Sequence, residues 1–226
     1  MSQWPFNMEL GKAVTIHTRN MSWVASPSAG VERKPLEREK AESGRTSSIV
    51  RYAPGSSFPH HVHDGGEEFL VLKGIFSDEH DDYPTGTYVR NPPMSAHAPF
   101  TENGCTIFVK LCQFQRGDRQ RVVLDTHKMP QQQPYRQAIC SVLLHQFNSE
   151  LVELERWKAG VKVEFPEDTE GVEIFVLKGD MQNSRENFPE GSWIRRPAGV
   201  HHSFMSVQGC LIYKKTGHLH DSTDTF

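Results

Sequence analysis

The chain has few cysteines, and none of them are spaced as a metal-binding pair. Its 226 residues include four cysteines, and no two of these are separated by only two residues. This spacing argues against a cysteine-rich zinc site. We interpret the four as free thiols of a reduced, cytoplasmic protein, each buried as a small apolar side chain. They are Cys105, Cys112, Cys140 and Cys210.

Long apolar segments and a strong net charge are also missing. No apolar run approaches the length that spans a bilayer, and the first ten residues include acidic and polar residues where a signal peptide would be apolar. The net charge is only −3 at pH 7, so there is no broad basic surface for nucleic acid or an anionic membrane. We therefore expect neither a nucleic acid nor a membrane as a partner.

Helical periodicity is scarce, whereas turn-forming and aromatic residues are common. The chain contains 13 Phe, 14 Pro and 17 Gly, a composition that favours β-strands joined by many turns. Runs of β-branched and aromatic residues predict strands at 46–53, 67–72 and 105–114.

Residues 55–74 hold two histidines and a glutamate at strand spacing. His61 and His63 are two residues apart, so in a strand their imidazoles point to the same face. The glycine-rich turn that follows allows the next strand to return beside them, which brings Glu67 to the same place. Two nitrogens and one carboxylate oxygen suit a divalent transition metal.

Residues 86–97 supply a fourth candidate ligand. Gly86 opens a strand, a pair of prolines closes it, and His97 begins the next strand. The intervals in these two stretches match the two motifs of cupin barrels, with Met94 in place of the usual glycine of the second motif. The sequence thus predicts an all-β cupin with one divalent metal ion, bound by His61, His63, Glu67 and His97.

The pattern recurs 105 positions later without a gap. We therefore predict two tandem cupin domains, each a double-stranded β-helix or jelly roll, in a bicupin. The predicted parts are an N-terminal arm at 1–20, a metal-binding cupin at 21–118, a linker at 119–135 and a second cupin at 136–226. Matching positions include Gly55 and Gly160, Leu72-Lys73-Gly74 and Leu177-Lys178-Gly179, and Pro92 and Pro197.

The second copy has lost the metal-binding set. At the constant offset, His61, His63 and Glu67 correspond to Pro166, Asp168 and Val172, and only His97 is retained, as His202. We expect Val172, Ile174 and Val176 to fill that face as apolar core, and we interpret Asp168 as a solvated carboxylate.

One detail of strand phase leaves two alternatives open. Val161, Val163 and Phe165 alternate in the phase of Phe58 and His60, not in the phase of His61. Either Phe58 and His60 also point inward, or a bulge near Pro59 shifts the phase before His61.

Other polar residues near the motifs have simpler interpretations. Glu68 competes with Glu67 as a ligand, but spacing and strand phase favour Glu67, which leaves Glu68 as an outer partner or in a surface ion pair. His60 is expected to point outward. Arg90 recurs in the metal-free copy and is interpreted as part of a structural salt bridge, and the acidic residues 78–82 as a solvated turn.

The first domain resembles the ChrR-like cupins, strongly over residues of about 21–115 and weakly over about 136–216. The residues that carry this resemblance lie within 51–63, 66–74, 76–78, 83–86 and 90–97. The family is named for an anti-sigma factor whose C-terminal cupin binds zinc. A separate helical domain of that protein, with a histidine and a Cys-x-x-Cys pair, captures the sigma factor, and no such pair occurs here.

The resemblance implies a metal-binding regulatory, sensor or small-molecule-binding protein, with no direct sigma-factor binding. Other cupins similar to this group are Fe(II) dioxygenases that cleave diketones or hydroxyacetophenones, and they provide an alternative function. They use three histidines without the carboxylate. One ion per chain is expected, Zn or Fe(II), with Mn or Ni also compatible. The sequence leaves open whether the chain is an enzyme and whether it forms a homodimer.

Overall fold

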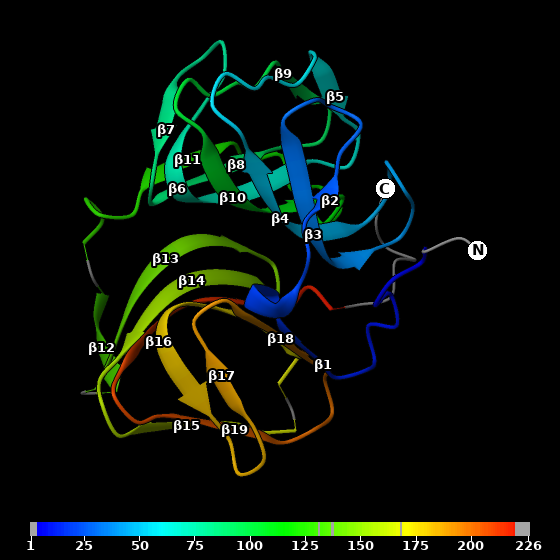
Figure 1. Ribbon diagram of the computed structural model, residues 1–226. Helices are drawn as coiled ribbons and strands as arrows, with labels where there is room; N and C mark the ends of the chain where they lie inside the picture. The colour runs from blue at the N-terminus through cyan, green and yellow to red at the C-terminus, as the bar shows by residue number, and fades with distance from the viewer. Residues whose placement is uncertain (1–3, 131, 137, 168, 220–226) are drawn as a thin grey trace. The chain divides into compact units, whose positions relative to one another are not determined.

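The computed structural model describes residues 4–130, 132–136, 138–167 and 169–219, and regular structure within them is almost entirely β-strand (Figure 1). One short 3-10 turn, η1 (Thr18–Asn20), is the exception in these ranges. No helix in this part of the chain is long and apolar enough to cross a membrane. The chain divides into two compact units, formed by residues 4–8 with 22–128 and by residues 9–21 with 129–219. This is the predicted all-β bicupin.

The first unit contains one large and one small antiparallel sheet. The eight-stranded sheet follows the order β11-β8-β6-β10-β4-β3-β2, with β7 paired to β6, and β5 pairs with β9 separately. The strands are β2 (Val24–Ala25), β3 (Val31–Arg38), β4 (Thr46–Tyr52), β5 (His61–His63), β6 (Glu67–Ser77), β7 (Asp82–Pro84), β8 (Thr87–Asn91), β9 (Ser95–His97), β10 (Cys105–Leu111) and β11 (Val122–Asp125).

The second unit repeats this topology. Its main path is β1-β18-β16-β20-β14-β13-β12, while β15 pairs with β19, and both β17 and β19 pair with β16. The strands are β1 (Val14–His17), β12 (Gln132–Arg136), β13 (Ile139–Phe147), β14 (Glu150–Trp157), β15 (Val161–Phe165), β16 (Val172–Gln182), β17 (Asn187–Pro189), β18 (Ser192–Arg196), β19 (His202–Ser206) and β20 (Cys210–Thr216).

A shared irregularity in β6 and β16 supports the predicted duplication. Each strand has a one-residue register shift against its partner, at Leu72 in β6 and at Leu177 in β16. The glycine two residues later has a positive φ, 78° at Gly74 and 79° at Gly179. A Cβ atom at either glycine would lie 2.1 or 2.3 Å from a backbone carbonyl oxygen, so a side chain is excluded there. The repeated Leu-Lys-Gly sequence is therefore a bulge followed by a close backbone contact.

Each unit has its own apolar core. In the first, inward residues such as Val50, Phe69 and Val109 pack together, and in the second, Val172, Ile174 and Val176 occupy the predicted core face. All four cysteines are free. Cys105 and Cys210 are buried in the two cores, and burial raises the pKa of each thiol to about 11. The structure gives Cys112 and Cys140 only partial burial.

The segments predicted as an arm and a linker are part of the sheets. Val14–His17, within the predicted arm 1–20, pairs with β18 of the second unit. Residues 119–135 were expected to connect the domains, yet Val122–Asp125 extends the first sheet beside β8, and β12 pairs with β13. Pairing with an exposed sheet edge depends on partners distant in sequence, so local composition does not reveal it.

Candidate metal centre

A bulge before β5 turns His61 and His63 inward. The backbone N–H of Phe58 donates to the carbonyl of Pro99 (2.8 Å), and His61 then lies opposite His97. His61 lies three residues after Phe58, whereas its partner His97 lies only two residues before Pro99. The first segment therefore contains one extra residue, at Pro59–His60. This settles the phase question in favour of the bulge. His60 is exposed, as expected.

The structure brings together the three predicted histidines. Their ring centroids are 4.7 Å (His61–His63), 5.2 Å (His61–His97) and 4.9 Å (His63–His97) apart. One ring nitrogen of each lies within 4.8 Å of the others. His61 and His97 face each other across the β5–β9 pair, and His63 follows His61 on the same strand face. Two short strands therefore suffice to direct three imidazoles to one point.

Glu67 completes this group from the start of β6. Its Oε2 lies 3.4 Å from Nε2 of His63 and 3.5 Å from Nε2 of His97. The amide Nδ2 of Asn91, opposite Glu67 on β8, donates to the same oxygen (3.2 Å) and helps to fix its position. Asn91 was not predicted as a site residue, although it directly follows Arg90 in the second motif.

Two of the histidines are oriented from behind through Nδ1. Nδ1 of His61 lies 2.8 Å from the Pro59 carbonyl oxygen, and Nδ1 of His97 lies 3.1 Å from Oδ2 of Asp78. Both partners are acceptors, so each Nδ1 carries a proton, and in the neutral ring, which is the form that binds a metal, the lone pair lies on Nε2. Second partners of this kind commonly orient metal-binding histidines.

The group has the unsatisfied donor atoms that a metal ion would use. Within the described residues, the buried Nε2 atoms of His63 and His97 have no hydrogen-bond partner. Buried polar atoms are rarely left in this state, because the lost hydration is not replaced. Burial, the largest contribution, lowers the pKa of His63; Glu67 opposes this, and His97 and His61 add to it. A neutral imidazole is the form that binds a metal, so the residues fit such an ion.

The environment of Asp78 differs from the one predicted from the sequence. Residues 78–82 were interpreted as a solvated turn, but Asp78 is 7% exposed and contacts His97. Burial tends to raise the pKa of Asp78. The opposing hydrogen bonds from the backbone of His80, from His97, from the backbone of Asp81 and from the Tyr83 hydroxyl lower it overall. The carboxylate is therefore ionised at neutral pH.

Glu68 and Arg90 belong to a separate buried ion-pair cluster. Arg90 is fully buried and contacts Glu68 (2.6 Å) and Asp118 (2.8 Å), and its guanidinium lies 4.0 Å from the centre of the Phe114 ring. The expected structural salt bridge of Arg90 is present. Glu68 is only 2% exposed and thus does not form the surface pair that was one expectation.

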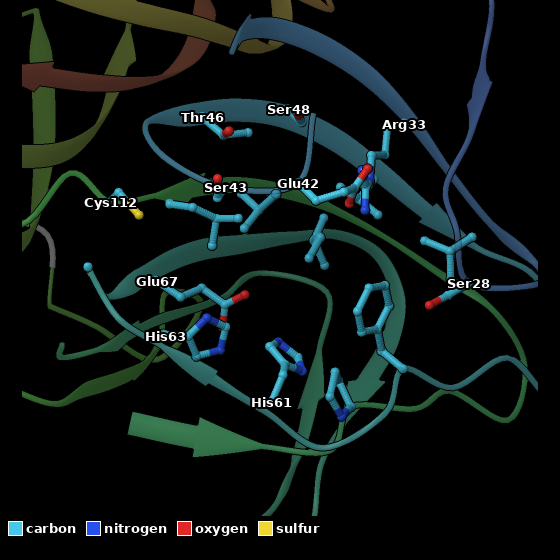
Figure 2. A pocket seen from close by; sticks show the side chains of 18 of the residues that line it. Ser28, Arg33, Glu42, Ser43, Thr46, Ser48, His61, His63, Glu67 and Cys112 are labelled. Carbon is cyan, nitrogen blue, oxygen red and sulfur yellow. The ribbon is translucent and has the colours of Figure 1, made fainter. Parts of the chain in front are cut away.

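A pocket of ≈ 510 Å³ adjoins the histidines. Figure 2 shows His61, His63 and Glu67 along one side of it. A cavity of this size accommodates a small organic molecule. Its apolar lining comes largely from β4 and β10, and includes Val50, Tyr52, Ile107, Val109 and Leu111.

The corresponding region of the second unit is apolar. Phe165 lies opposite His202 where the first unit has His61 opposite His97, and Val172 lies opposite Arg196 where the first unit has Glu67 opposite Asn91. Phe165 and Val172 are both core residues. Asp168 lies outside the described residues. In the part of the chain that the structure describes, His61, His63 and His97 form the one cluster of at least three potential metal-binding residues.

Several solved structures share this fold at low sequence identity. A Nostoc punctiforme protein provisionally named a dioxygenase has a TM-score of 0.75 and 13% identity over 96% of this chain and 86% of that one. The Escherichia coli protein YlbA has a TM-score of 0.70 and 13% identity over 94% of this chain and 93% of that one. An oxalate decarboxylase of Bacillus subtilis, described with Mn(II) centres, has a TM-score of 0.59 and 10% identity over 92% of this chain and 78% of that one. These similarities show the fold alone.

Comparison of sequences, unlike comparison of folds, identifies the family. No curated protein matches the chain. The profile of the ChrR cupin-like domain matches twice, over residues 11–115 and 119–220, which together cover most of the chain. Each match contains the main strands of one unit. The protein therefore belongs to the ChrR cupin-like family and carries two copies of its domain.

Proposed function

We propose that this chain is a regulatory or sensory cupin that binds one divalent metal ion in its first unit and a small molecule beside it. The proposed ligands are His61, His63, Glu67 and His97. The observation that carries the proposal is the convergence of three imidazoles and one carboxylate at the wall of the pocket.

The donor set restricts the class of metal. Imidazole and carboxylate together suit Zn, Fe, Mn and Ni, whereas thiolate ligands would favour softer ions. Cys112 also lines the pocket, but burial raises the pKa of its thiol and so disfavours a thiolate. A bound divalent ion supplies Lewis acidity, and a redox-active one also supplies electron transfer.

The protein residues would hold and shield the ion. His61, His63 and Glu67 line the pocket, and of the four residues His61 is the most exposed: it is half-buried, whereas His63, Glu67 and His97 are 7%, 6% and 2% exposed, respectively. A small molecule in the pocket would therefore approach the centre from the side of His61. Its binding would change the surroundings of the ion, which is the property that a sensor needs.

Metal analysis of the full chain tests this proposal. Protein purified without added metal and then loaded is expected to hold one ion per chain by mass spectrometry of the elements. Replacing both His61 and His63 by Ala should remove the ion. The matched control, His201→Ala with His202→Ala, changes two histidines of the second unit and should keep one ion. Two ions per chain, or loss of the ion in the control variant, would refute the proposal.

An Fe(II)-dependent dioxygenase is the second candidate. The pocket beside the histidines favours it, because an oxygenase needs space for an organic substrate next to its metal. Purification with iron, together with dioxygen uptake on addition of a β-diketone, would support this function. Zinc in the purified protein, and no dioxygen uptake after loading with Fe(II), would favour the sensor.

A further inference from the structure

A charged side chain lies among the inward-facing residues of β3. Arg33 follows Val31 in the same strand phase and pairs with Val50 on β4, and both valines belong to the core of the first unit. The Arg33 side chain is 16% exposed and lines the pocket. Core packing alone favours an apolar residue at such a position, since burying a guanidinium costs free energy unless an anion accompanies it.

Two guanidinium groups share one carboxylate at this end of the pocket. Nη1 of Arg33 lies 3.0 Å from both carboxylate oxygens of Glu42, and Arg38 approaches the same carboxylate at 3.8 Å. The charges of these three side chains sum to +1. Burial lowers the pKa of Arg38 most, repulsion by Arg33 lowers it further, and Glu42 opposes both effects. Another anion at this end would therefore be stabilised.

Glu42 is the displaceable member of this group. Its side chain is 53% exposed, and it lies in the irregular segment between β3 and β4, outside the strand pairing. In Figure 2, Arg33 and Glu42 lie on the upper side of the pocket, whereas His61, His63 and Glu67 lie on the lower side. A ligand that reached both Arg33 and the histidines would thus lie along the apolar lining residues of β4 and β10.

We propose that the pocket takes an organic acid with an apolar body, whose carboxylate replaces Glu42 on Arg33. Carboxylate is the group for which a guanidinium has matching geometry and charge, and Glu42 already occupies that place. The apolar body would lie against Val50, Ile107 and Val109, and the end remote from the carboxylate would lie toward His61. Only this last contact rests on the proposed metal-dependent function.

The test compares acids with their uncharged amides. Benzoate, 3-phenylpropionate and hexanoate, each beside its amide, are titrated into the metal-loaded full chain by calorimetry. At least one acid should bind about 10- to 100-fold more tightly than its amide, the range for a charged hydrogen-bonded contact. Arg33→Met should abolish this preference. Arg51→Met is the matched control, because Arg51 forms an exposed pair with Glu32 on the neighbouring strand, outside the pocket.

A second variant tests the role of Glu42 without removing the arginine. Glu42→Gln should tighten acid binding several-fold, because the competing carboxylate is gone, while the control Glu32→Gln should not. Circular dichroism of every variant checks that it is folded.

Three results would overturn the inference: no acid binds more tightly than its amide, Arg33→Met keeps the preference, or Glu42→Gln does not strengthen it. The variant with Ala at both 61 and 63 could lose the preference for the acid while Arg33→Met keeps it. That result would place the ligand carboxylate at the histidines and would also overturn the inference. Metal content is measured in the same samples. Arg33-dependent acid binding by a chain that holds no metal would sink the proposed function but support this inference.

Discussion

Asp78 should control metal affinity through the tautomer of His97. The substitution Asp78→Asn keeps the size of the side chain but replaces one oxygen by an N–H donor. Oδ1 of Asp78 accepts hydrogen bonds from the backbone N–H groups of His80 (2.9 Å) and Asp81 (3.1 Å), so the amide oxygen of Asn should remain there. The new NH₂ group would then face Nδ1 of His97, now 3.1 Å from Oδ2. Two donors cannot hydrogen-bond to each other.

His97 would have to move its proton from Nδ1 to Nε2, which removes the lone pair directed at the centre. Loss of such an outer partner of a metal-binding histidine typically weakens metal affinity about 10- to 100-fold. This corresponds to about 1.4–2.7 kcal/mol of binding free energy. Competition with a chelator of known affinity at pH 7.5 measures the change.

Tyr83→Phe provides a matched control for this prediction. The Tyr83 hydroxyl donates to both carboxylate oxygens of Asp78 (3.1 and 3.3 Å), so the variant removes a neighbour of Asp78 but keeps the contact of Asp78 with His97. Its metal affinity should fall by less than that of Asp78→Asn. If Asp78→Asn is folded and binds metal as tightly as the unchanged chain, the reasoning about the tautomer is wrong.

Three further predictions concern the fold, the pH dependence and the partners. The variant with Ala at positions 61 and 63 should keep its β-type circular dichroism spectrum, because the core of the first unit does not include either histidine; an unfolded spectrum would mean that the metal is structural. Metal should be released as pH falls from 8 to 4, since protons compete for imidazole nitrogens that titrate at about pH 6.5 when free. The pKa of His63 is lowered in the folded chain, so its contribution to stability is complete above the unfolded value and is lost as pH falls through the folded value; a flat release curve would contradict the histidine site. Finally, the isolated chain should recover no sigma factor in a pull-down, and recovery of one would refute that expectation.

Much of the fold follows from periodicities that sequence makes visible. Strand alternation places His61 and His63 on one face, and the constant offset between the copies predicts that Gly74 and Gly179 occupy equivalent positions. The structure gives both glycines the same backbone conformation and the same close contact. Strand alternation and the repeat are both properties of the sequence itself, so they are visible before any contact between distant residues is known.

Other features depend on contacts between distant residues, and local patterns do not encode them. Asp78 lies in an acidic run that resembles any solvated turn, and only the path of β9 brings His97 to it. The phase of the second copy predicts a bulge near Pro59 only as one of two alternatives, and the partners of Phe58 and His61 decide between them. Val14–His17 has only four residues, and its partner, β18, lies far along the chain, so the sequence near this segment does not reveal the pairing.

The most direct test of the metal site is anomalous X-ray scattering from crystals of the metal-loaded chain, recorded on both sides of the absorption edge of the bound metal. We expect one peak per chain, at the point enclosed by the ring nitrogens of His61, His63 and His97 and the carboxylate of Glu67. A peak in the second unit, or a peak at any position not contacted by these three histidines, would contradict the account.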